Sequence, residues 1–423
     1  MGFKKDHSQL QEVSKFFTEE TLKDIFSVMC NGKNIEVLGW DFGEASAKGD
    51  SYLSTVNRIK IKGNVDGEEK QISIVVKSLP QNIGRRRTFR STEFFANEII
   101  VYTDIFPKFK EFLESKGQSE LLCVPKLVAS VRDGANDFIA LEDVSVIGFG
   151  PVARQNSIDI NQCSLILKTM ARFHAISFAY KDQKKDDFSQ MKDLLCETYF
   201  SANQWSWYKN FHKRLVEVAV DALSKECPGS LAEKKYTSVP FGDLFWKSVE
   251  FCSHKDEPTS VISQGDSWAP NFLARQNDKE QDALMLDFQL ARCSSPILDL
   301  SFCIYSCTDK KFRDESFDDM LKLYYDELAS AISLLGSDPQ KLYSWDMFMK
   351  EVKEQFVFGM VFAMEAIPFA ILDPSEAFDL DTLITGDEAE DIANVWQLQT
   401  IKSQSGRLRL ADVITHTVEN GFF

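Results

Sequence analysis

Hydrophobic and polar positions follow two different periods along the chain, and the change of period divides it. Near the N-terminus apolar residues recur at helical spacing, as at Leu10, Val13 and Phe17, and predict a helical lead-in over residues 1–30. The segment that follows carries short apolar runs typical of strands, separated by turns that contain glycine. Three strands are predicted there, over residues 35–40, 52–62 and 71–79.

One helix and two further strands come next. Residues 94–113 return to helical spacing, with a break expected at Pro107, because its ring cannot continue a helix. Residues 127–130 and 138–141 read as two more strands. Together these elements predict a β-rich N-terminal lobe with one key helix over residues 1–144.

The remaining residues, 145–423, are mostly helical in pattern. Apolar positions at i, i+3 and i+4 predict helices over residues 160–180, 205–225, 241–251, 312–335 and 345–372. A β-like patch interrupts them at residues 260–263, 271–274 and 283–288. We therefore expect an α+β, bilobal protein with a larger helical C-terminal lobe and a cleft between the lobes.

Composition and net charge limit the kinds of molecule that the protein is expected to bind. The 34 Phe residues are explained first by core packing and second by an aromatic pocket for an apolar ligand. A net charge of −16 repels phosphate backbones, so no nucleic acid partner is expected. Nine scattered Cys without a C-x-x-C pair favour a reducing compartment. Without a secretory signal or an apolar run of about 18 residues, we expect a cytoplasmic protein with no membrane span and no evident obligate protein partner.

The most informative stretch runs from residue 264 to residue 271 and is followed by Asp287-Phe288-Gln289. Asp266 and Asn271 have the spacing D-x-x-x-x-N, which in kinases places a carboxylate beside the acceptor hydroxyl and an amide oxygen on magnesium. Asp287 follows an apolar run and can project from a strand end to hold Mg²⁺. Singly, each residue could belong to a turn or a cap. In this order and spacing they indicate phosphoryl transfer with ATP and Mg²⁺.

A kinase also needs a lysine on a strand, a glutamate on the next helix and an earlier glycine-containing turn. Lys77 ends an alternating strand pattern, and Glu98 lies in the following helix, where it can pair with Lys77. Gly43 and Gly49 flank a turn whose backbone N–H groups could approach phosphate. The chain has no G-x-x-x-x-G-K-[ST] motif, so a P-loop enzyme is excluded.

These motifs resemble the ecdysteroid kinase-like family, also called CHK kinase-like, which is related to choline kinases and aminoglycoside phosphotransferases. The pattern of that family reads H-G-D-x-W-x-x-N, then D-F-Q, then S-P-x-x-D-L. The corresponding segments of this chain are residues 264–271, 287–289 and 295–300. Shorter matches occur at residues 49–54, 76–77, 97–102, 141–143 and 174–175, so the resemblance spans residues 43–300.

The resemblance implies a protein-kinase-like fold and ATP:alcohol phosphotransferase activity. It implies that Asp266 is the catalytic aspartate and that Asn271 and Asp287 ligate Mg²⁺. The residues that it assigns to the nucleotide are Lys77, Glu98, Gly49, Ser51, Glu142 and Val144. Asp299 is expected to anchor the catalytic loop. Gln264 stands where the family usually has His; because Gln also donates and accepts hydrogen bonds, we expect activity to survive.

Three functions remain open. The leading hypothesis is a kinase that phosphorylates a hydroxyl of an ecdysteroid-like or other lipophilic alcohol, with Trp205, Trp207 and Tyr208 as candidate pocket residues. The alternative enzyme is a choline, ethanolamine or xenobiotic kinase, since a cationic acceptor would need acidic and aromatic walls. The third hypothesis is a degenerate, nucleotide-binding pseudokinase, and the retained metal-binding residues argue against it.

Overall fold

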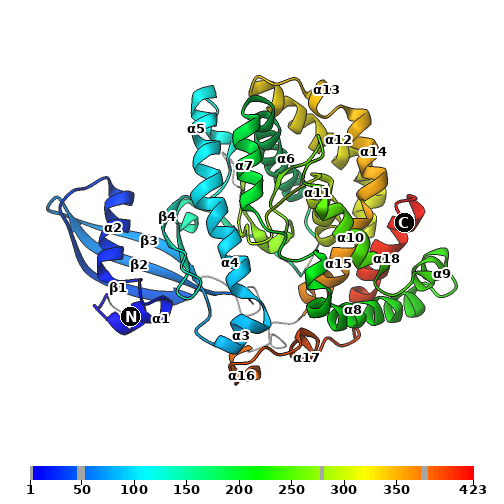
Figure 1. The fold of residues 1–423 in the computed structure, drawn as a ribbon, viewed down its shortest axis with the longest axis horizontal. Coiled ribbons are helices and arrows are strands. Elements are labelled where there is room, and N and C mark those ends of the chain that lie inside the picture. Colours follow the sequence, from blue (N-terminus) through cyan, green and yellow to red (C-terminus); the bar gives the residue numbers. More distant parts are fainter. Residues whose placement is uncertain (1–2, 45–52, 156, 277–280, 373–379) are drawn as a thin grey trace. The chain divides into compact units, whose positions relative to one another are not determined.

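The computed structural model describes residues 3–44, 53–155, 157–276, 281–372 and 380–423 (Figure 1). The chain forms two compact units, and each is discontinuous in sequence. Unit 1 comprises Met1–Tyr102, Pro125–Phe149 and Asp373–Asp391, and unit 2 comprises Thr103–Val124, Gly150–Leu372 and Ile392–Phe423. The division of the chain into an N-terminal lobe of residues 1–144 and a C-terminal lobe of residues 145–423 stays a prediction.

Unit 1 is built, within its described residues, on a five-stranded antiparallel sheet of order β1-β2-β3-β5-β4. The strands are β1 (Ile35–Glu44), β2 (Thr55–Val65), β3 (Glu68–Ser78), β4 (Leu127–Val131) and β5 (Phe138–Glu142). The turn between β2 and β3 is Asp66-Gly67, and both residues have positive φ. Two-residue hairpins favour this pair because the turn needs left-handed backbone at both positions. The strands predicted from sequence periodicity are confirmed.

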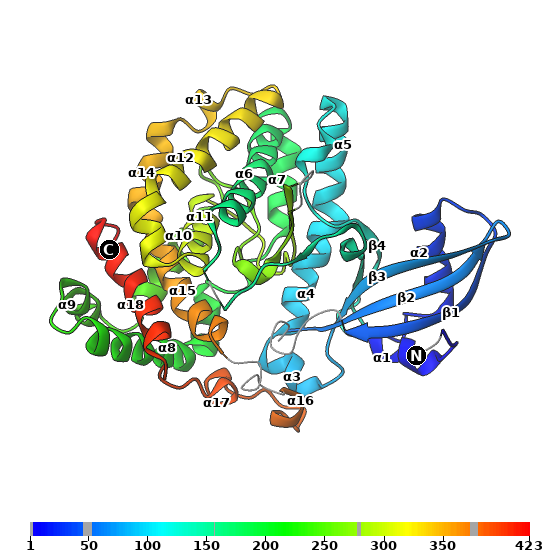
Figure 2. The same ribbon diagram turned by 180° about the vertical axis from the view of Figure 1, so that it is seen from behind.

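The described helices of unit 1 lie before the first strand, between β3 and β4, and after the last strand in sequence. They are α1 (His7–Val13), α2 (Glu19–Cys30), α3 (Ile83–Thr88), α4 (Ser91–Ile100) and α16 (Leu380–Leu383), with a 3-10 turn η3 (Val144–Ile147). The predicted helical lead-in is two helices, because Thr18 caps α2 and so starts a new helix. Helix α2 lies along one face of the sheet (Figures 1 and 2), where Phe26 packs with Ile59 and Ile61 in the core. The two isoleucines share a face because strand side chains alternate.

The helix predicted over residues 94–113 is interrupted, but the interruption lies before Pro107 and not at Pro107 as predicted. Helix α4 ends at Ile100, a π-helical turn η1 spans Val101–Ile105, and α5 (Phe106–Lys116) follows. Pro107 lies in the first turn of α5. A proline is tolerated there because the first N–H groups of a helix have no intrahelical partner.

Unit 2 is mostly helical. Besides α5, its described helices are α6 (Ile160–Gln183), α7 (Lys185–Leu194), α8 (Trp205–Glu226), α9 (Leu231–Ser238), α10 (Asp243–Ser253), α11 (Ile297–Cys307), α12 (Lys310–Leu334), α13 (Pro339–Leu342), α14 (Trp345–Gln355), α15 (Val357–Ala370), α17 (Ile392–Trp396) and α18 (Gln404–Glu419). Short 3-10 turns are η2 (Ser119–Leu121), η4 (Ala202–Gln204) and η5 (Ala269–Asn271).

Two short antiparallel sheets among the described residues of unit 2 correspond to the predicted β-like patch. In one, β7 (Val261–Ser263) pairs with β10 (Arg292–Ser294). In the other, β8 (Phe272–Gln276) lies between β6 (Gly150–Pro151) and β9 (Gln281–Met285). The loops that join these strands carry the motifs singled out in the sequence.

Helix α15 is apolar on all sides and buried, with Glu365 as its single charged residue. Gly359 allows α15 to approach α11 closely, because a Cβ at Gly359 would lie 2.3 Å from the backbone of Ser301. Helix α11 therefore rests directly on α15, and its first turn carries Asp299.

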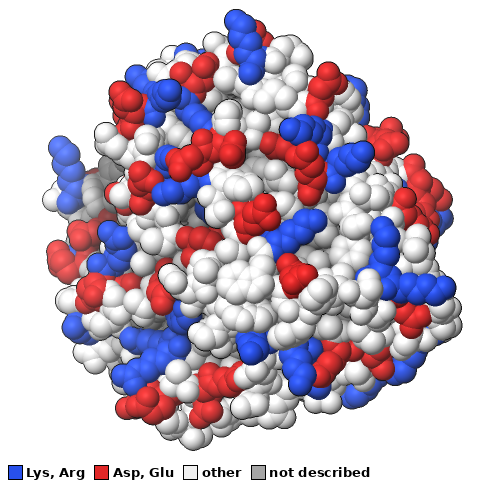
Figure 3. Space-filling view, turned by 45° about the vertical axis from the view of Figure 1, so that its right-hand side comes forward, with Lys and Arg blue, Asp and Glu red and all other residues white. Residues whose placement is uncertain are grey.

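The α+β class, with one strand-rich unit and one larger helical unit, is confirmed. Among the described residues, no helix combines the length and the apolar character that crossing a bilayer requires. Acidic and basic side chains are interspersed on the face drawn in Figure 3.

Candidate active site

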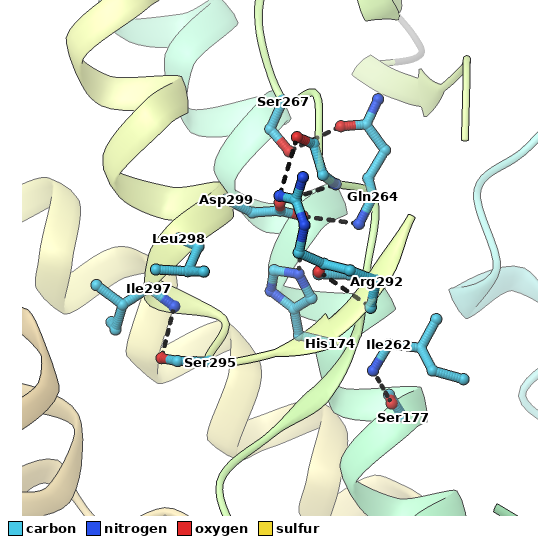
Figure 4. Close-up of polar contacts among 12 residues, drawn as sticks. His174, Ser177, Ile262, Gln264, Ser267, Arg292, Ser295, Ile297, Leu298 and Asp299 are labelled. Carbon is cyan, nitrogen blue, oxygen red and sulfur yellow. Dashed lines mark hydrogen bonds and ion pairs between the residues drawn. The ribbon is translucent and has the colours of Figure 1, made fainter. Parts of the chain in front are cut away.

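Residues 264–271 form a loop between β7 and β8 whose start is anchored by Asp299. The Asp299 carboxylate accepts the backbone N–H groups of Gln264 at 2.8 Å and of Gly265 at 2.9 Å (Figure 4). The same carboxylate lies 3.3 Å from Nε2 of His174, whose Nδ1 lies 2.6 Å from the hydroxyl of Tyr324. Asp299 therefore anchors the loop, and His174 is a hydrogen-bonded core residue that orients it.

The electrostatics of Asp299 agree with this role. Burial alone would raise the pKa of its carboxyl, but the hydrogen bond and charge of His174, the charge of Arg292 and the backbone donors outweigh burial. The pKa of Asp299 therefore lies below its ordinary value, and the side chain is a stable acceptor for the loop at neutral pH.

The side chain of Gln264 connects this loop to the segment after β9. Its Nε2 donates to the carbonyl oxygens of Leu286 at 2.7 Å and Asp287 at 3.2 Å. Its Oε1 accepts from the N–H of Asp266 at 3.0 Å and from the hydroxyl of Ser267 at 2.8 Å. One buried amide thus holds the Asp266 loop against the Asp287 segment. A neutral imidazole has one donor and one acceptor nitrogen, so Gln is at least as well suited to this bridge as the usual His.

We expect Gln264→Ala to lower the free energy of unfolding by about 2 kcal/mol or more, because it leaves buried polar groups without partners. Gln264→His should retain part of the bridge and give an intermediate loss. Urea unfolding of both variants, with Gln399→Ala as control, measures this; Gln399 is exposed and bonds only the carbonyl of Gln397. A Gln264→Ala protein as stable as the control would contradict the bridging role.

Asp266 and Asn271 contact each other within the loop. Nδ2 of Asn271 donates to the backbone oxygen and to Oδ2 of Asp266, each at 2.9 Å. This use of the amide nitrogen leaves the Asn271 oxygen as the atom that can bind a cation. Burial, and next the charge of Asp287, raise the pKa of Asp266 to about 8. The two carboxylates are therefore within electrostatic range of each other.

Asp287 follows β9 with a backbone φ of 58°, in the left-handed region. Asp and Asn are the residues other than glycine that most readily adopt this conformation. The preceding residue, Leu286, donates its N–H to the carbonyl of Asn271 at 2.9 Å. The Asp287 carboxylate and the Asn271 amide supply the hard oxygen ligands that Mg²⁺ prefers, so these residues fit that ion. No group of three or more His, Cys, Asp or Glu side chains in the described part of the chain could hold a metal.

Two residues that hold the loop, Arg292 and Glu197, were not predicted from the sequence. Arg292 is 2% exposed; its Nε donates to Glu197 at 2.6 Å and its Nη1 donates to the carbonyl of Gly265 at 3.3 Å. Burial alone would lower the pKa of Arg292, but the Glu197 carboxylate outweighs burial and raises it. A signal was present, since Arg292 interrupts an apolar run, and a buried arginine requires a charged partner. The partner, 95 residues away, could not be identified from that run.

In unit 1 the structure brings Lys77 and Glu98 together. Lys77 is the penultimate residue of β3 and pairs with Ile139 of β5, and Glu98 lies in α4. Their side chains form an ion pair at 2.6 Å, with the lysine 13% and the glutamate 3% exposed. Nζ of Lys77 also lies 5.8 Å from the ring centroid of Phe95. The role of this pair in nucleotide binding stays a prediction.

The other residues assigned to the nucleotide are placed only in part. Gly49 and Ser51 lie outside the described residues, whereas Gly43 lies within β1. Glu142 is the last residue of β5, and Val144 is the first residue of η3. Their contacts with a nucleotide stay predictions.

A family model described as the ecdysteroid kinase-like family matches residues 48–337, which is more than half of the chain. The chain belongs to the ecdysteroid kinase-like family. This membership confirms the resemblance inferred from the motifs and indicates a small-molecule kinase. No curated protein matches the sequence.

Several solved kinase structures are similar to this member of the ecdysteroid kinase-like family. An ethanolamine kinase of Plasmodium vivax is 12% identical with a TM-score of 0.40, covering 90% of this chain and 81% of that chain. The choline kinase LicA of Streptococcus pneumoniae is 13% identical with a TM-score of 0.32, covering 83% and 98%. An aminoglycoside phosphotransferase of Streptomyces rimosus is 12% identical with a TM-score of 0.30, covering 75% and 96%.

Proposed function

We propose that this kinase transfers the terminal phosphoryl group of ATP to a hydroxyl group of a small molecule. The observation that carries the proposal is the convergence of Asp266, Asn271 and Asp287 in unit 2. Asn271 bonds Asp266 directly, and Gln264 bonds the backbone at both Asp266 and Asp287. A loop that only joined two strands would not need to hold two carboxylates and an amide oxygen in one place against their mutual repulsion.

Asp266 is proposed as the group that orients the acceptor hydroxyl and takes its proton. The hydroxyl oxygen forms a new bond to the terminal phosphorus, the bond from that phosphorus to the bridging oxygen breaks, and ADP leaves with the bond electrons. The proton of the hydroxyl passes to the Asp266 carboxylate. The ionised form of Asp266 is the one that can take this proton, and Mg²⁺ held nearby would favour that form, because a neighbouring cation stabilises a charged carboxylate.

The remaining assignments concern nucleotide and metal. Asn271 and Asp287 are proposed to hold Mg²⁺, which when bound offsets the negative charge of the phosphates. Lys77, held by Glu98, is proposed to bind the α- and β-phosphates. Further nucleotide contacts are proposed for Gly49, Ser51, Glu142 and Val144.

The acceptor is proposed to be an ecdysteroid-like or other lipophilic alcohol, with choline, ethanolamine or a xenobiotic as the alternative. Purified protein incubated with Mg-ATP and a panel that includes an ecdysteroid, choline and neutral alcohols should yield a phosphate adduct detected by mass. Loss of the adduct on omitting Mg²⁺ is expected. ATP binding without any adduct across the panel would favour the pseudokinase hypothesis instead.

We expect Asp287→Asn to weaken Mg-ATP binding about tenfold or more, since even outer partners of metal ligands cost 10–100-fold in affinity. Asn keeps the shape and tolerates the left-handed backbone, so the change isolates the charge. Titration calorimetry with and without Mg²⁺ measures the effect. Asp66→Asn is a matched control, because Asp66 also has a left-handed backbone, with a φ of 52°, in an exposed turn. Equal Mg-ATP affinity in the two variants would contradict the metal assignment.

A further inference from the structure

Glu365 is a carboxylate placed in the apolar helix α15, and two tyrosines bind it. The hydroxyl of Tyr199 donates to the carboxylate and lies 2.6 Å from one of its oxygens and 2.7 Å from the other. The hydroxyl of Tyr208 donates to one of these oxygens at 2.9 Å. Tyr199 and Tyr208 are buried, and Glu365 is partly buried. The mechanism above gives these three residues no role.

The sequence offers many cations, but the contacts of this carboxylate within the described residues include no counter-ion. Among the described residues, no Lys, Arg or His forms an ion pair with Glu365. Burial raises the pKa of Glu365 to about 7, while the two tyrosine hydrogen bonds act in the opposite direction. Burial, and next the Glu365 charge, raise the pKa of both tyrosines, so they stay protonated donors. A carboxylate removed from water in this way gains most from a cationic partner.

The two tyrosines that bind Glu365 pack against further aromatic rings. The Tyr199 ring centroid lies 5.6 Å from that of Trp207 and 5.6 Å from that of Phe362, and the Tyr208 ring stacks on Phe245 at 5.4 Å. Aromatic faces attract cations, and quaternary ammonium groups are recognised in this way. Of the residues that the sequence suggested for a pocket, Tyr208 therefore bonds a carboxylate that the sequence did not suggest, and Trp207 contacts the ring of Tyr199, which bonds the same carboxylate.

A chain of contacts connects Glu365 to the catalytic loop. Arg292, which bonds the carbonyl of Gly265, also bonds Glu197. Glu197 in turn accepts the backbone N–H of Tyr199 at 2.9 Å, so the tyrosine that binds Glu365 is fixed relative to the loop.

We propose that Glu365, Tyr199 and Tyr208 bind the positively charged amine of the acceptor, whose hydroxyl faces Asp266. The acceptor class is then an amino alcohol, with an apolar surface on the cationic side that packs on the aromatic rings. The inference rests on the proposed phosphoryl transfer and, of the two acceptor classes proposed above, selects the cationic alternative over the ecdysteroid-like alcohol. A neutral alcohol would leave the Glu365 charge uncompensated, which is why the structure favours the cationic class over the neutral one.

Choline and its neutral carbon isostere 3,3-dimethylbutan-1-ol differ mainly in charge and test this inference directly. Full-length protein should phosphorylate choline with a lower KM than the isostere. Glu365→Gln keeps the shape and an acceptor for the tyrosines but removes the charge. It should raise the KM for choline at least about tenfold, since removing one partner of a desolvated charge pair is costly, and leave the KM for ATP unchanged. The KM for the isostere should not rise.

Glu354→Gln is the matched control, because Glu354 is an exposed glutamate of the neighbouring helix α14. Circular dichroism reports whether Glu365→Gln folds; if it does not, Tyr199→Phe replaces it and should raise the KM for choline several-fold.

An unchanged KM for choline in the folded variant, or phosphorylation of neutral alcohols alone, overturns the amino alcohol inference and leaves phosphoryl transfer intact. If no compound of the panel is phosphorylated, titration calorimetry with choline tests the inference by measuring binding alone. Saturable choline binding that Glu365→Gln abolishes supports the site, and absence of binding overturns it.

Discussion

Replacing Asp266 by Asn should lower kcat by about 10²- to 10⁴-fold, the range typical of removing a general base. The Asn side chain can still accept the hydrogen bond from Asn271, so the loop should keep its conformation. What it cannot do is take the proton of the acceptor hydroxyl. Affinity for Mg-ATP should therefore stay close to that of the unsubstituted protein.

Two measurements separate these effects: the rate of phosphate adduct formation with the best panel compound, and calorimetric binding of Mg-ATP. Asp282→Asn provides the control for losing one negative charge, because Asp282 is exposed on β9 and pairs only at the surface with Arg275. Turnover that survives Asp266→Asn at the level of the control would remove Asp266 from the reaction.

The same substitution should stabilise the metal-free protein in a pH-dependent way. The pKa of Asp266 is raised from 3.8 to about 8, so the folded protein holds this proton more tightly than the unfolded chain does. Stability of the unsubstituted protein therefore falls, relative to Asp266→Asn, as pH rises from about 4 to about 8, and the difference levels off above that range. Thermal unfolding of both proteins across this range, without metal, measures the difference; a pH-independent difference would contradict the raised pKa.

Gly265→Ala is expected to be the most damaging single methyl addition in the loop. Gly265 has a φ of +85°, and a Cβ there would lie 1.9 Å from the carbonyl oxygen of Leu290. That atom belongs to the backbone and cannot move aside as the end of a long side chain could. Adding the costs of backbone strain and of overpacking gives a loss of about 2–6 kcal/mol in the free energy of unfolding.

Gly229→Ala separates the two causes of this loss. Gly229 also has positive φ, at +74°, but nothing lies within 4 Å of a Cβ added there. That variant should lose about 1–2 kcal/mol from the left-handed backbone alone. Urea unfolding of both variants gives the difference, which is the clash with Leu290. Equal losses in the two proteins would show that the loop can move away from Leu290.

Activity should follow the geometry in Gly265→Ala. The backbone N–H of Gly265 is held by Asp299 and its carbonyl by Arg292, so the loop can relieve the clash only by stretching these contacts. A displacement of about 1 Å at Asp266 is enough to cost about 10²-fold in rate. Under conditions where Gly265→Ala is folded, its kcat should therefore fall, whereas that of Gly229→Ala should not.

Much of the fold followed from local patterns. Period-two runs identified the strands of unit 1, and i, i+3, i+4 spacing identified α6, α8, α10 and α12 of unit 2, because burial of one face imposes that periodicity on neighbouring residues. The helix predicted over residues 345–372 is instead two helices, α14 and α15, and α11 and α18 were not predicted. The motifs at residues 264–271, 287–289 and 295–300 were enough to indicate the family. The sequence pattern wrongly placed the interruption of the helix over residues 94–113 at Pro107. A proline is tolerated in the first turn of a helix, and Pro107 lies in the first turn of α5.

The partners of the site residues came only from the folded chain. Glu197 meets Arg292 across 95 residues, and Tyr199 meets Glu365 across 166, whereas periodicity carries information over a few residues only. Helix α15 is apolar on every side, so no pattern shows which face meets the aromatic residues or what its one carboxylate contacts. Sequence thus determined the elements and the motif, and tertiary packing decided which charges are buried and which are paired.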